Sequence, residues 1–177
     1  MVLAHPRLVA VLIPTFQVCH LQRPIDFDIA IAGAGIVGLT LACALKDSGL
    51  KIALIEARPR DAGLSQHRAY AITLMSGQIF RGLGVWSQIS PHIATFDQIR
   101  LADAECSAVV NLQPEDLGTD ELGYVGEHSV LIKALLEKLT DADKITWLCP
   151  AELVQTGYQP EAVDLTLSVS GVSSDDS

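Results

Sequence analysis

The sequence predicts an α/β fold built on a βαβ unit with a parallel sheet, and three features lead to this prediction. Residues 27–32 are an apolar, β-rich run that ends in a glycine-rich turn at 33–38. Residues 39–48 are good helix formers and end at Gly49, a residue that takes a positive φ without strain. A second apolar run, 51–55, follows the helix, and a strand–helix–strand crossover within ~30 residues requires parallel strands.

Two further helices are predicted. Residues 73–83 can form a helix that stops at Gly84. Residues 129–139 repeat leucine at every fourth position, so one face of this helix is apolar. Ser129 is expected to cap its N-terminus, and we expect the apolar face to pack on the sheet.

The remaining β-like segments lie in the second half of the chain. Residues 99–102 and 108–112 flank a short polar turn and predict a hairpin. Three more segments close the chain, at 145–148, 152–155 and 163–169. The last of them alternates apolar and polar residues, as a half-solvated strand does.

The ordered part of the chain is expected at residues 26–169. Residues 1–25 hold one short apolar run stopped by Pro14, with only a weak match to a signal peptide, and we expect a disordered extension. Residues 170–177 are rich in Ser and Asp and are expected to be a disordered tail.

Composition and charge exclude several classes of protein. Hydrophobic residues make up 49% of the 177 and charged residues 19%, which excludes intrinsic disorder. The 12 Lys and Arg against 21 Asp and Glu give a net charge of −9, which disfavours nucleic acid as a partner. No run reaches the ~18 apolar residues of a membrane-spanning helix.

The metal-binding and redox-active residue types form no recognisable cluster. The 4 cysteines lack the C-x-x-C spacing of zinc sites, and the histidines are scattered, so no metal site is expected. Reduced thiols of this kind fit a cytoplasmic protein, with or without peripheral attachment to a membrane.

The glycine turn and the acidic residue after the second strand form a dinucleotide-binding pattern of the Rossmann-like type. Gly33 permits a sharp turn, Gly35 lets a pyrophosphate approach the backbone, and Gly38 lets the helix pack closely on the strand. Glu56 can accept hydrogen bonds from a ribose diol and would repel a 2′-phosphate. The predicted contacts also include the neighbours of these residues in the sequence, Ile36, Val37 and Ala57.

Three segments in the same order resemble one family, the FAD-dependent aromatic hydroxylases of ubiquinone biosynthesis, which are relatives of p-hydroxybenzoate hydroxylase. The first is the glycine segment at 28–42; the second joins His67-Arg68-Ala69-Tyr70-Ala71-Ile72 to Leu83-Gly84-Val85-Trp86. The third, residues 122–131, is similar to the family's Leu-Gly-Tyr-Val-Val-Glu-Asn-Arg-Val-Leu. The resemblance runs from about Asp26 to Val169 and implies a partial FAD-binding domain with the start of a β-rich substrate region.

The resemblance also implies roles for two residues outside the glycine turn. Arg68 matches the family arginine that reaches the FAD pyrophosphate and ribityl region. His128 stands where the family usually has Asn, which implies a polar contact near the ribityl chain. Ser129 departs from the commoner Arg, so the family contacts at this turn are in doubt, and a helix cap is at least as good an interpretation.

The resemblance implies an enzyme that takes electrons from NAD(P)H and uses O₂ and FAD to hydroxylate a polyprenylphenol. The cofactor carries this chemistry, so no catalytic side chain is expected in the chain. The sequence lacks the family's later Asp-Gly and Gly-Asp motifs, so we expect an N-terminal portion that is inactive alone. It would self-associate or pair with a C-terminal half.

Two other functions remain open at this point. An NAD-dependent dehydrogenase would use the same fold, and Glu56 would serve either cofactor, so only Arg68 and residues 122–131 favour FAD. A non-catalytic nucleotide-binding remnant is the third hypothesis, because the later motifs are missing.

Overall fold

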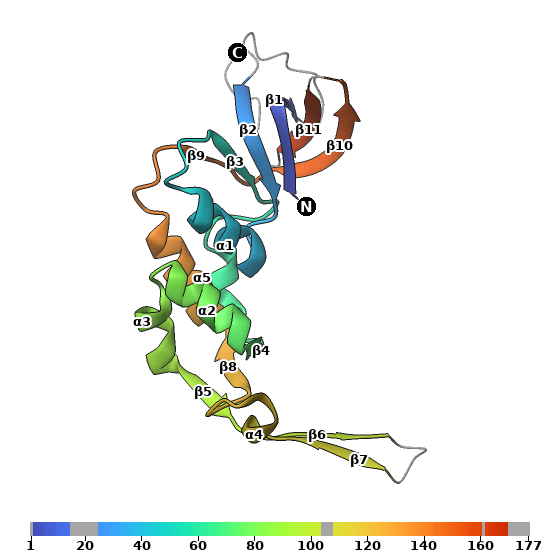
Figure 1. Cartoon of the computed structure of the whole chain (residues 1–177). Coiled ribbons are helices and arrows are strands. Elements are labelled where there is room, and N and C mark those ends of the chain that lie inside the picture. Colours follow the sequence, from blue (N-terminus) through green and yellow to red (C-terminus); the bar gives the residue numbers. More distant parts are fainter. Residues whose placement is uncertain (1, 15–24, 104–107, 161, 170–177) are drawn as a thin grey trace. The chain divides into compact units, whose positions relative to one another are not determined.

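The computed structural model describes residues 2–14, 25–103, 108–160 and 162–169 (Figure 1). The chain forms two compact units. The first takes its described residues from Met1–Gly63 and Leu135–Ser177, and the second is Leu64–Ala134.

The first unit contains the predicted βαβ unit. Strands β2 (Ile25–Ala32) and β3 (Ile52–Ile55) are parallel, and helix α1 (Ile36–Leu45) connects them and contacts both. Strand β9 (Ile145–Leu148) adds in parallel on the other side of β3. The α/β fold class and the parallel arrangement are therefore confirmed. The helix begins at Ile36, inside the glycine segment and earlier than the predicted start at residue 39.

The sheet of the first unit continues on the other side of β2 with strands of mixed direction. Its order is β10-β11-β1-β2-β3-β9, where β1 is Val2–Pro14, β10 is Glu152–Tyr158 and β11 is Val163–Val169. β1 runs antiparallel to β2 and parallel to β11, and β10 runs antiparallel to β11. All three closing segments predicted from the sequence, now β9, β10 and β11, thus join the same sheet as the βαβ unit.

The N-terminal region differs from the prediction of a disordered extension at 1–25. Val2–Pro14 form β1, which lies between β2 and β11 and pairs with both. A strand in this position satisfies backbone groups on two neighbours, which local sequence patterns do not reveal. Residues 15–24 and the expected tail at 170–177 lie outside the described residues.

Both faces of this sheet carry buried side chains. Neighbouring residues of a strand point to opposite faces, and all of β3 is buried, so β3 lies in the middle layer of the unit. The buried residues of this unit include the core cluster made of Phe27, Ala30, Ala53, Ile55, Ala151, Val163, Leu165 and Leu167. Helix α1, with Leu39, Ala42 and Cys43 buried, contacts β2 and β3.

The second unit is built on a three-stranded antiparallel sheet in the order β4-β8-β5. Its strands are β4 (Ala69–Thr73), β5 (Ile93–Phe96) and β8 (Gly123–Glu127), and its helices include α2 (Leu74–Gly82) and α3 (Trp86–Ile89). α2 contacts β4 and β8 and confirms the helix predicted at 73–83. Its N-cap is Thr73, whose hydroxyl accepts a hydrogen bond from Ser76 N at 3.2 Å. Short 3₁₀ turns occupy Ala62–Ser65 and Ser90–His92.

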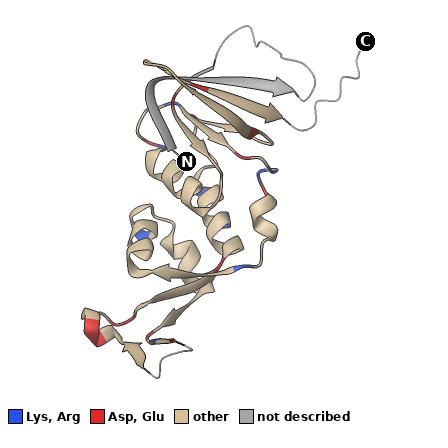
Figure 2. Ribbon diagram, turned by 90° about the vertical axis from the view of Figure 1, so that its right-hand side faces the viewer, with Lys and Arg blue, Asp and Glu red and all other residues tan. Residues whose placement is uncertain are grey.

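The predicted hairpin is present in the second unit. β6 (Ile99–Ala102) and β7 (Val109–Leu112) pair antiparallel as a separate two-stranded sheet (Figure 1). Helix α4 (Pro114–Leu117) follows and ends at Gly118, whose φ is 65°. Its first turn is acidic, with Glu115 and Asp116 (red in Figure 2), a placement that suits a helix N-terminus.

Helix α5 (His128–Lys138) confirms the predicted helix with its start moved by one residue. The expected Ser129 cap is wrong: Ser129 lies inside the helix, and its hydroxyl donates to Glu127 Oε2 at 3.3 Å. In the first unit, Cys43 Sγ on α1 donates to Leu135 O of α5 at 3.5 Å. Burial raises the pKa of the Cys43 thiol to about 11, so this cysteine is a packing residue and not a reactive thiolate.

Candidate functional site

The turn between β2 and α1 has a backbone conformation that favours glycine at its first position. Gly33 has φ of 103°, in the region that L side chains rarely adopt. Its N–H donates to Ile55 O at 2.8 Å, which ties the turn to the end of β3. The first helical hydrogen bond of α1 runs from Leu39 N to Gly35 O at 2.9 Å.

The other two glycines of the motif meet opposite surroundings. A Cβ at Gly38 would lie 1.9 Å from Gly33 O, so the helix can approach the strand only without a side chain there. A Cβ at Gly35 would meet no atom within 4 Å. Packing within the protein therefore does not explain Gly35, whose outer side is open space that a bound group can occupy.

Glu56 extends from the end of β3 to this turn. Its Oε2 accepts a hydrogen bond from Ala34 N at 2.9 Å. The backbone around it is fixed on the β9 side, because Glu56 N donates to Leu148 O at 3.0 Å and Ala151 N donates to Glu56 O at 2.8 Å. The carboxylate thus lies at the mouth of the glycine turn, although the two residues are 22 positions apart in the sequence.

Glu56 is ionised at neutral pH. Partial burial raises the pKa of this carboxyl, but hydrogen bonds from Ala34 and Arg58 and the charge of the Arg58 guanidinium together outweigh burial. The net effect lowers the pKa of Glu56 below its ordinary value of 4.5.

The arrangement combines two complementary binding surfaces. The N–H groups in the first turn of α1 have no carbonyl acceptor within the helix. They carry partial positive charge at the helix N-terminus, which suits phosphate oxygens. α1 has no charged residue in its first or last turn, so the backbone alone supplies that charge. The Glu56 anion beside them suits a diol, which donates hydrogen bonds.

Three residues next to the glycines and Glu56 were also predicted to contact the cofactor, and all three are at least partly exposed. Val37 has 82% of its surface exposed at the start of α1, although it is a large apolar residue. Ile36 is half-buried, and Ala57 is exposed in the loop after Glu56. An exposed valine beside the open side of Gly35 is compatible with a surface that a ligand covers.

Arg68 and His128 are brought together in the second unit. His128 N donates to Arg68 O at 2.8 Å, which links the start of α5 to the residue preceding β4. The His128 side chain is buried, and its ring centroid lies 5.6 Å from that of Tyr70. The Arg68 side chain is exposed. The structure therefore groups the expected cofactor residues into the turn with Glu56 in one unit and the Arg68–His128 pair in the other.

Sequence reasoning missed two cationic side chains in the loop after β3. Arg58 forms an ion pair with Glu56 at 3.1 Å, and Arg60 lies over the Trp147 ring with 4.2 Å between the guanidinium carbon and the ring centroid. The position of Arg58, two residues after Glu56, could have indicated a contact between the two side chains. Nothing local links Arg60 to Trp147, which lies on β9.

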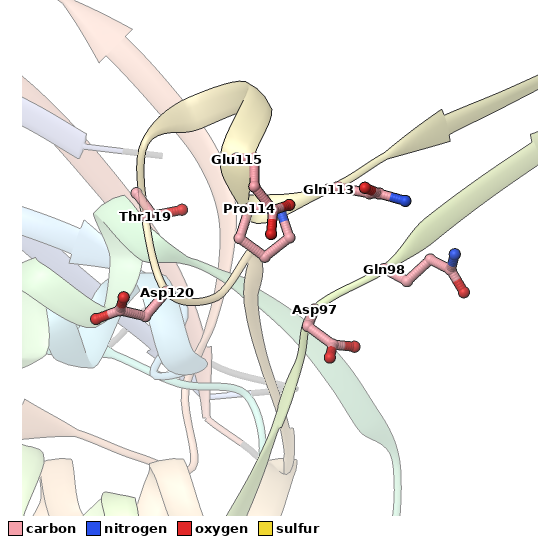
Figure 3. Close-up of a pocket in the computed structure, with 7 residues that line it drawn as sticks. All are labelled: Asp97, Gln98, Gln113, Pro114, Glu115, Thr119 and Asp120. Carbon is pink, nitrogen blue, oxygen red and sulfur yellow. The ribbon is translucent and has the colours of Figure 1, made fainter.

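The second unit also holds an open, acidic pocket of about 460 Å³ (Figure 3). It is lined by Asp97, Gln98, Gln113, Pro114, Glu115, Thr119 and Asp120. Within residues 2–14, 25–103, 108–160 and 162–169, no group of three or more His, Cys, Asp and Glu side chains is arranged to hold a metal ion. The described helices also include none with the length and apolar character needed to cross a bilayer.

Comparison with known sequences shows that this chain is similar to FAD-dependent oxidoreductases. A family model described as FAD dependent oxidoreductase matches residues 28–108, which include the glycine turn, Glu56 and Arg68. The protein slr1300 of Synechocystis is 42% identical over 151 residues, which cover 80% of this chain and 36% of that protein. Ubiquinone hydroxylase UbiL of Rhodospirillum rubrum is 30% identical, covering 80% of this chain and 33% of UbiL.

A third relative is similar in sequence, and two solved structures are similar in fold. The 3-demethoxyubiquinol 3-hydroxylase of Escherichia coli is 30% identical, covering 79% of this chain and 37% of the enzyme. The Diels-Alderase PyrE3 has a TM-score of 0.63 at 24% identity, covering 78% of this chain and 28% of PyrE3. The flavin-dependent monooxygenase PieE, solved with FAD and substrate, has a TM-score of 0.57 at 18% identity, covering 78% and 28%. The chain spans about a third of the length of the curated relatives it matches.

Proposed function

Because this chain belongs to the family of FAD-dependent hydroxylases of ubiquinone biosynthesis, we propose that its first unit binds the ADP half of FAD at the turn between β2 and α1. The observation that carries the proposal is the Glu56 carboxylate, hydrogen-bonded to Ala34 N beside the open side of Gly35. The amides of Ile36, Val37 and Gly38 would receive the diphosphate, and Glu56 with its neighbour Ala57 would flank the adenosine ribose.

Arg68 and His128 are proposed to contact the same cofactor nearer its flavin end. Arg68 is an exposed residue, and a guanidinium can pair with a phosphate in bidentate geometry. The backbone hydrogen bond from His128 N to Arg68 O supports a shared role, because it holds the two residues next to each other.

The reaction proposed for the whole protein is hydroxylation of a polyprenylated phenol in quinone biosynthesis, with NAD(P)H as the source of electrons. Bound FAD would supply the redox and oxygen chemistry, while the residues named above would bind and orient it. We also propose that the 177-residue chain has little or no hydroxylase activity by itself. Turnover of a polyprenylphenol by the purified chain with NADPH and O₂ would contradict this.

Self-association, or pairing with a second polypeptide, is proposed for the apolar face of the β6–β7 hairpin. This face consists of Ile99, Leu101, Val110 and Leu112, which are opposite each other in two pairs of the ladder. Leu101 and Val110 expose 56% and 54% of their surfaces, so the hairpin has an apolar side that no described residue covers fully.

Cofactor retention tests the proposed function directly. The purified chain is mixed with FAD, desalted and scanned for visible absorption, and we expect flavin to be retained. Glu56→Gln should reduce retention, because an amide is a weaker acceptor for the diol, whereas Glu152→Gln on the exposed side of β10 should not. Retention of NAD instead of FAD would support the dehydrogenase hypothesis, and retention of neither would support a non-catalytic remnant.

A further inference from the structure

The carboxylate of Glu56 is held by both of its oxygens. Oε2 accepts from Ala34 N at 2.9 Å, and Oε1 accepts from both Arg58 N and Arg58 Nε, each at 3.1 Å. A carboxylate offers about four acceptor positions, two on each oxygen. Arg58 fills both positions on Oε1, so the remaining position is on Oε2, the oxygen that faces the glycine turn.

Only one of the contacts from Arg58 depends on its side chain. The backbone N–H would reach Oε1 with any residue other than proline at this position, whereas the Nε hydrogen bond requires an arginine. The Glu56 side chain is 12% exposed and the Arg58 side chain 54%, so the acid is the enclosed partner and the arginine covers it from the solvent side.

Within the described residues, the elements around Glu56 bring no charged side chain other than Arg58 into an ion pair with it. The glycine turn, α1 and β9 contain no charged residue. The loop after β3 carries Arg58, Arg60 and Asp61, and the Arg60 guanidinium lies over Trp147 at 4.2 Å. Among the described residues, Arg58 is the ion-pair partner recorded for Glu56.

We infer that Arg58 is a positioning residue that fixes the Glu56 carboxylate so that Oε2 receives a hydroxyl of the ribose diol. The inference rests on the proposed FAD site and goes beyond it, because it assigns separate tasks to the two carboxylate oxygens. Oε1 is the anchored oxygen, and Oε2 is the ligand oxygen. Arg58 also offsets one negative charge close to where a diphosphate would bind, which reduces repulsion between the two anions.

The test measures FAD affinity by flavin fluorescence for the full chain and three variants, from neutral pH downward. Arg58→Gln should weaken FAD binding about three- to tenfold, since one charge-assisted hydrogen bond at a half-exposed position is lost. It should also move the pH at which binding is lost in acid upward, because Glu56 becomes easier to protonate. Arg58→Lys should lose FAD binding at the same acid pH as the wild type, since the cation remains. Its affinity for FAD at neutral pH should stay below that of the wild type, since Nε is missing.

Arg60→Gln is the matched control, because it removes the same charge from the same loop without touching Glu56. It should leave both the affinity for FAD and the pH at which binding is lost in acid unchanged, and circular dichroism should show all variants folded. The inference is overturned if Arg58→Gln has the affinity and the acid pH dependence of the wild type, or if Arg58→Gln and Arg60→Gln have equal effects. In both cases the wild-type chain still binds FAD, so the proposed function is unaffected. Failure of the wild-type chain to bind FAD would overturn the proposed function itself, and the inference with it.

Discussion

The glycines of the turn show how one residue type can answer different physical requirements at neighbouring positions. Gly33 is needed for its backbone conformation and Gly38 for a close contact between helix and strand. Neither requirement applies to Gly35, because its φ is not positive and a Cβ there would meet no atom within 4 Å. Substitutions at these positions should therefore separate stability from ligand binding.

Gly38→Ala is expected to lower the free energy of unfolding by at least about 1–3 kcal/mol, as overpacking does. The added methyl would lie 1.9 Å from a backbone carbonyl, which cannot move aside as a flexible side chain can. Gly35→Ala should cost at most about 1 kcal/mol, the scale of an N-cap change, yet should weaken FAD binding. Urea unfolding and FAD titration measure the two effects, and equal loss of stability in both variants would contradict this account.

Glu56 makes the stability of the first unit depend on pH. Its pKa is lowered in the folded chain, so its contribution is present above the ordinary value of 4.5 and is lost as the pH falls through the folded-state value. Glu56→Gln should lower the free energy of unfolding at neutral pH by about 0.5–1.5 kcal/mol, the scale of a net hydrogen bond. Urea unfolding at a series of pH values should show the difference between wild type and variant shrinking in acid, and a constant difference would refute the linkage.

At the scale of elements, β8 illustrates how glycine permits strands to pair closely with bulky neighbours. β8 is the central strand of its sheet, between β4 and β5. A Cβ at Gly123 would lie 2.7 Å from both Ile72 O and the Phe96 ring, whereas one at Gly126 would meet the Ile93 Cγ2 methyl at 2.6 Å. The first obstacle includes a backbone carbonyl, and the second is a methyl group of a side chain.

Gly123→Ala should therefore destabilise the second unit more than Gly126→Ala. Overpacking typically costs about 1–3 kcal/mol, and we expect Gly123→Ala at the upper end because a ladder carbonyl must shift. Ile93 can change rotamer to accommodate an alanine at 126, which reduces the cost there. Thermal unfolding of the two single variants provides the comparison, and the reverse order of stability would count against the close strand pairing described here.

At the scale of the whole molecule, the net charge of −9 and the β6–β7 hairpin act in opposite directions on association. Like charges keep copies of the chain apart, whereas an exposed apolar face favours contact between them. A two-stranded hairpin is marginally stable in water unless a third strand or another layer covers it. The apolar face of this hairpin would therefore be stabilised by a partner that covers it.

We expect the chain to self-associate with increasing concentration, and more strongly when salt screens its charge. Leu101→Lys should weaken this association, because it places a charge in the middle of the apolar face. Arg100→Lys, at the neighbouring position on the opposite face, keeps the charge and should change nothing. Sedimentation velocity measures the result, and concentration-independent monomers of the wild type would exclude a role for this face between copies of the chain.

The elements that the sequence predicted correctly are those with strong local patterns. The βαβ unit, the helices at α2 and α5 and the β6–β7 hairpin combine apolar periodicity with glycine or polar boundaries. β4, β5 and β8 were not predicted, because they are short, and β8 contains two inward-packed glycines that weaken its strand propensity. Their pairing partners are distant in the sequence, and cross-strand contacts rather than local preference stabilise them.

By itself, the sequence determined the order strand–turn–helix–strand, the glycine spacing and the acidic residue after the second strand, since each depends on neighbours within one element. Only the tertiary structure decided that the carboxylate of Glu56 meets Ala34 N, that Arg58 anchors its other oxygen, and that Val2–Pro14 enters the sheet. These contacts join residues through space, and their formation depends on the packing of the whole sheet rather than on any local propensity.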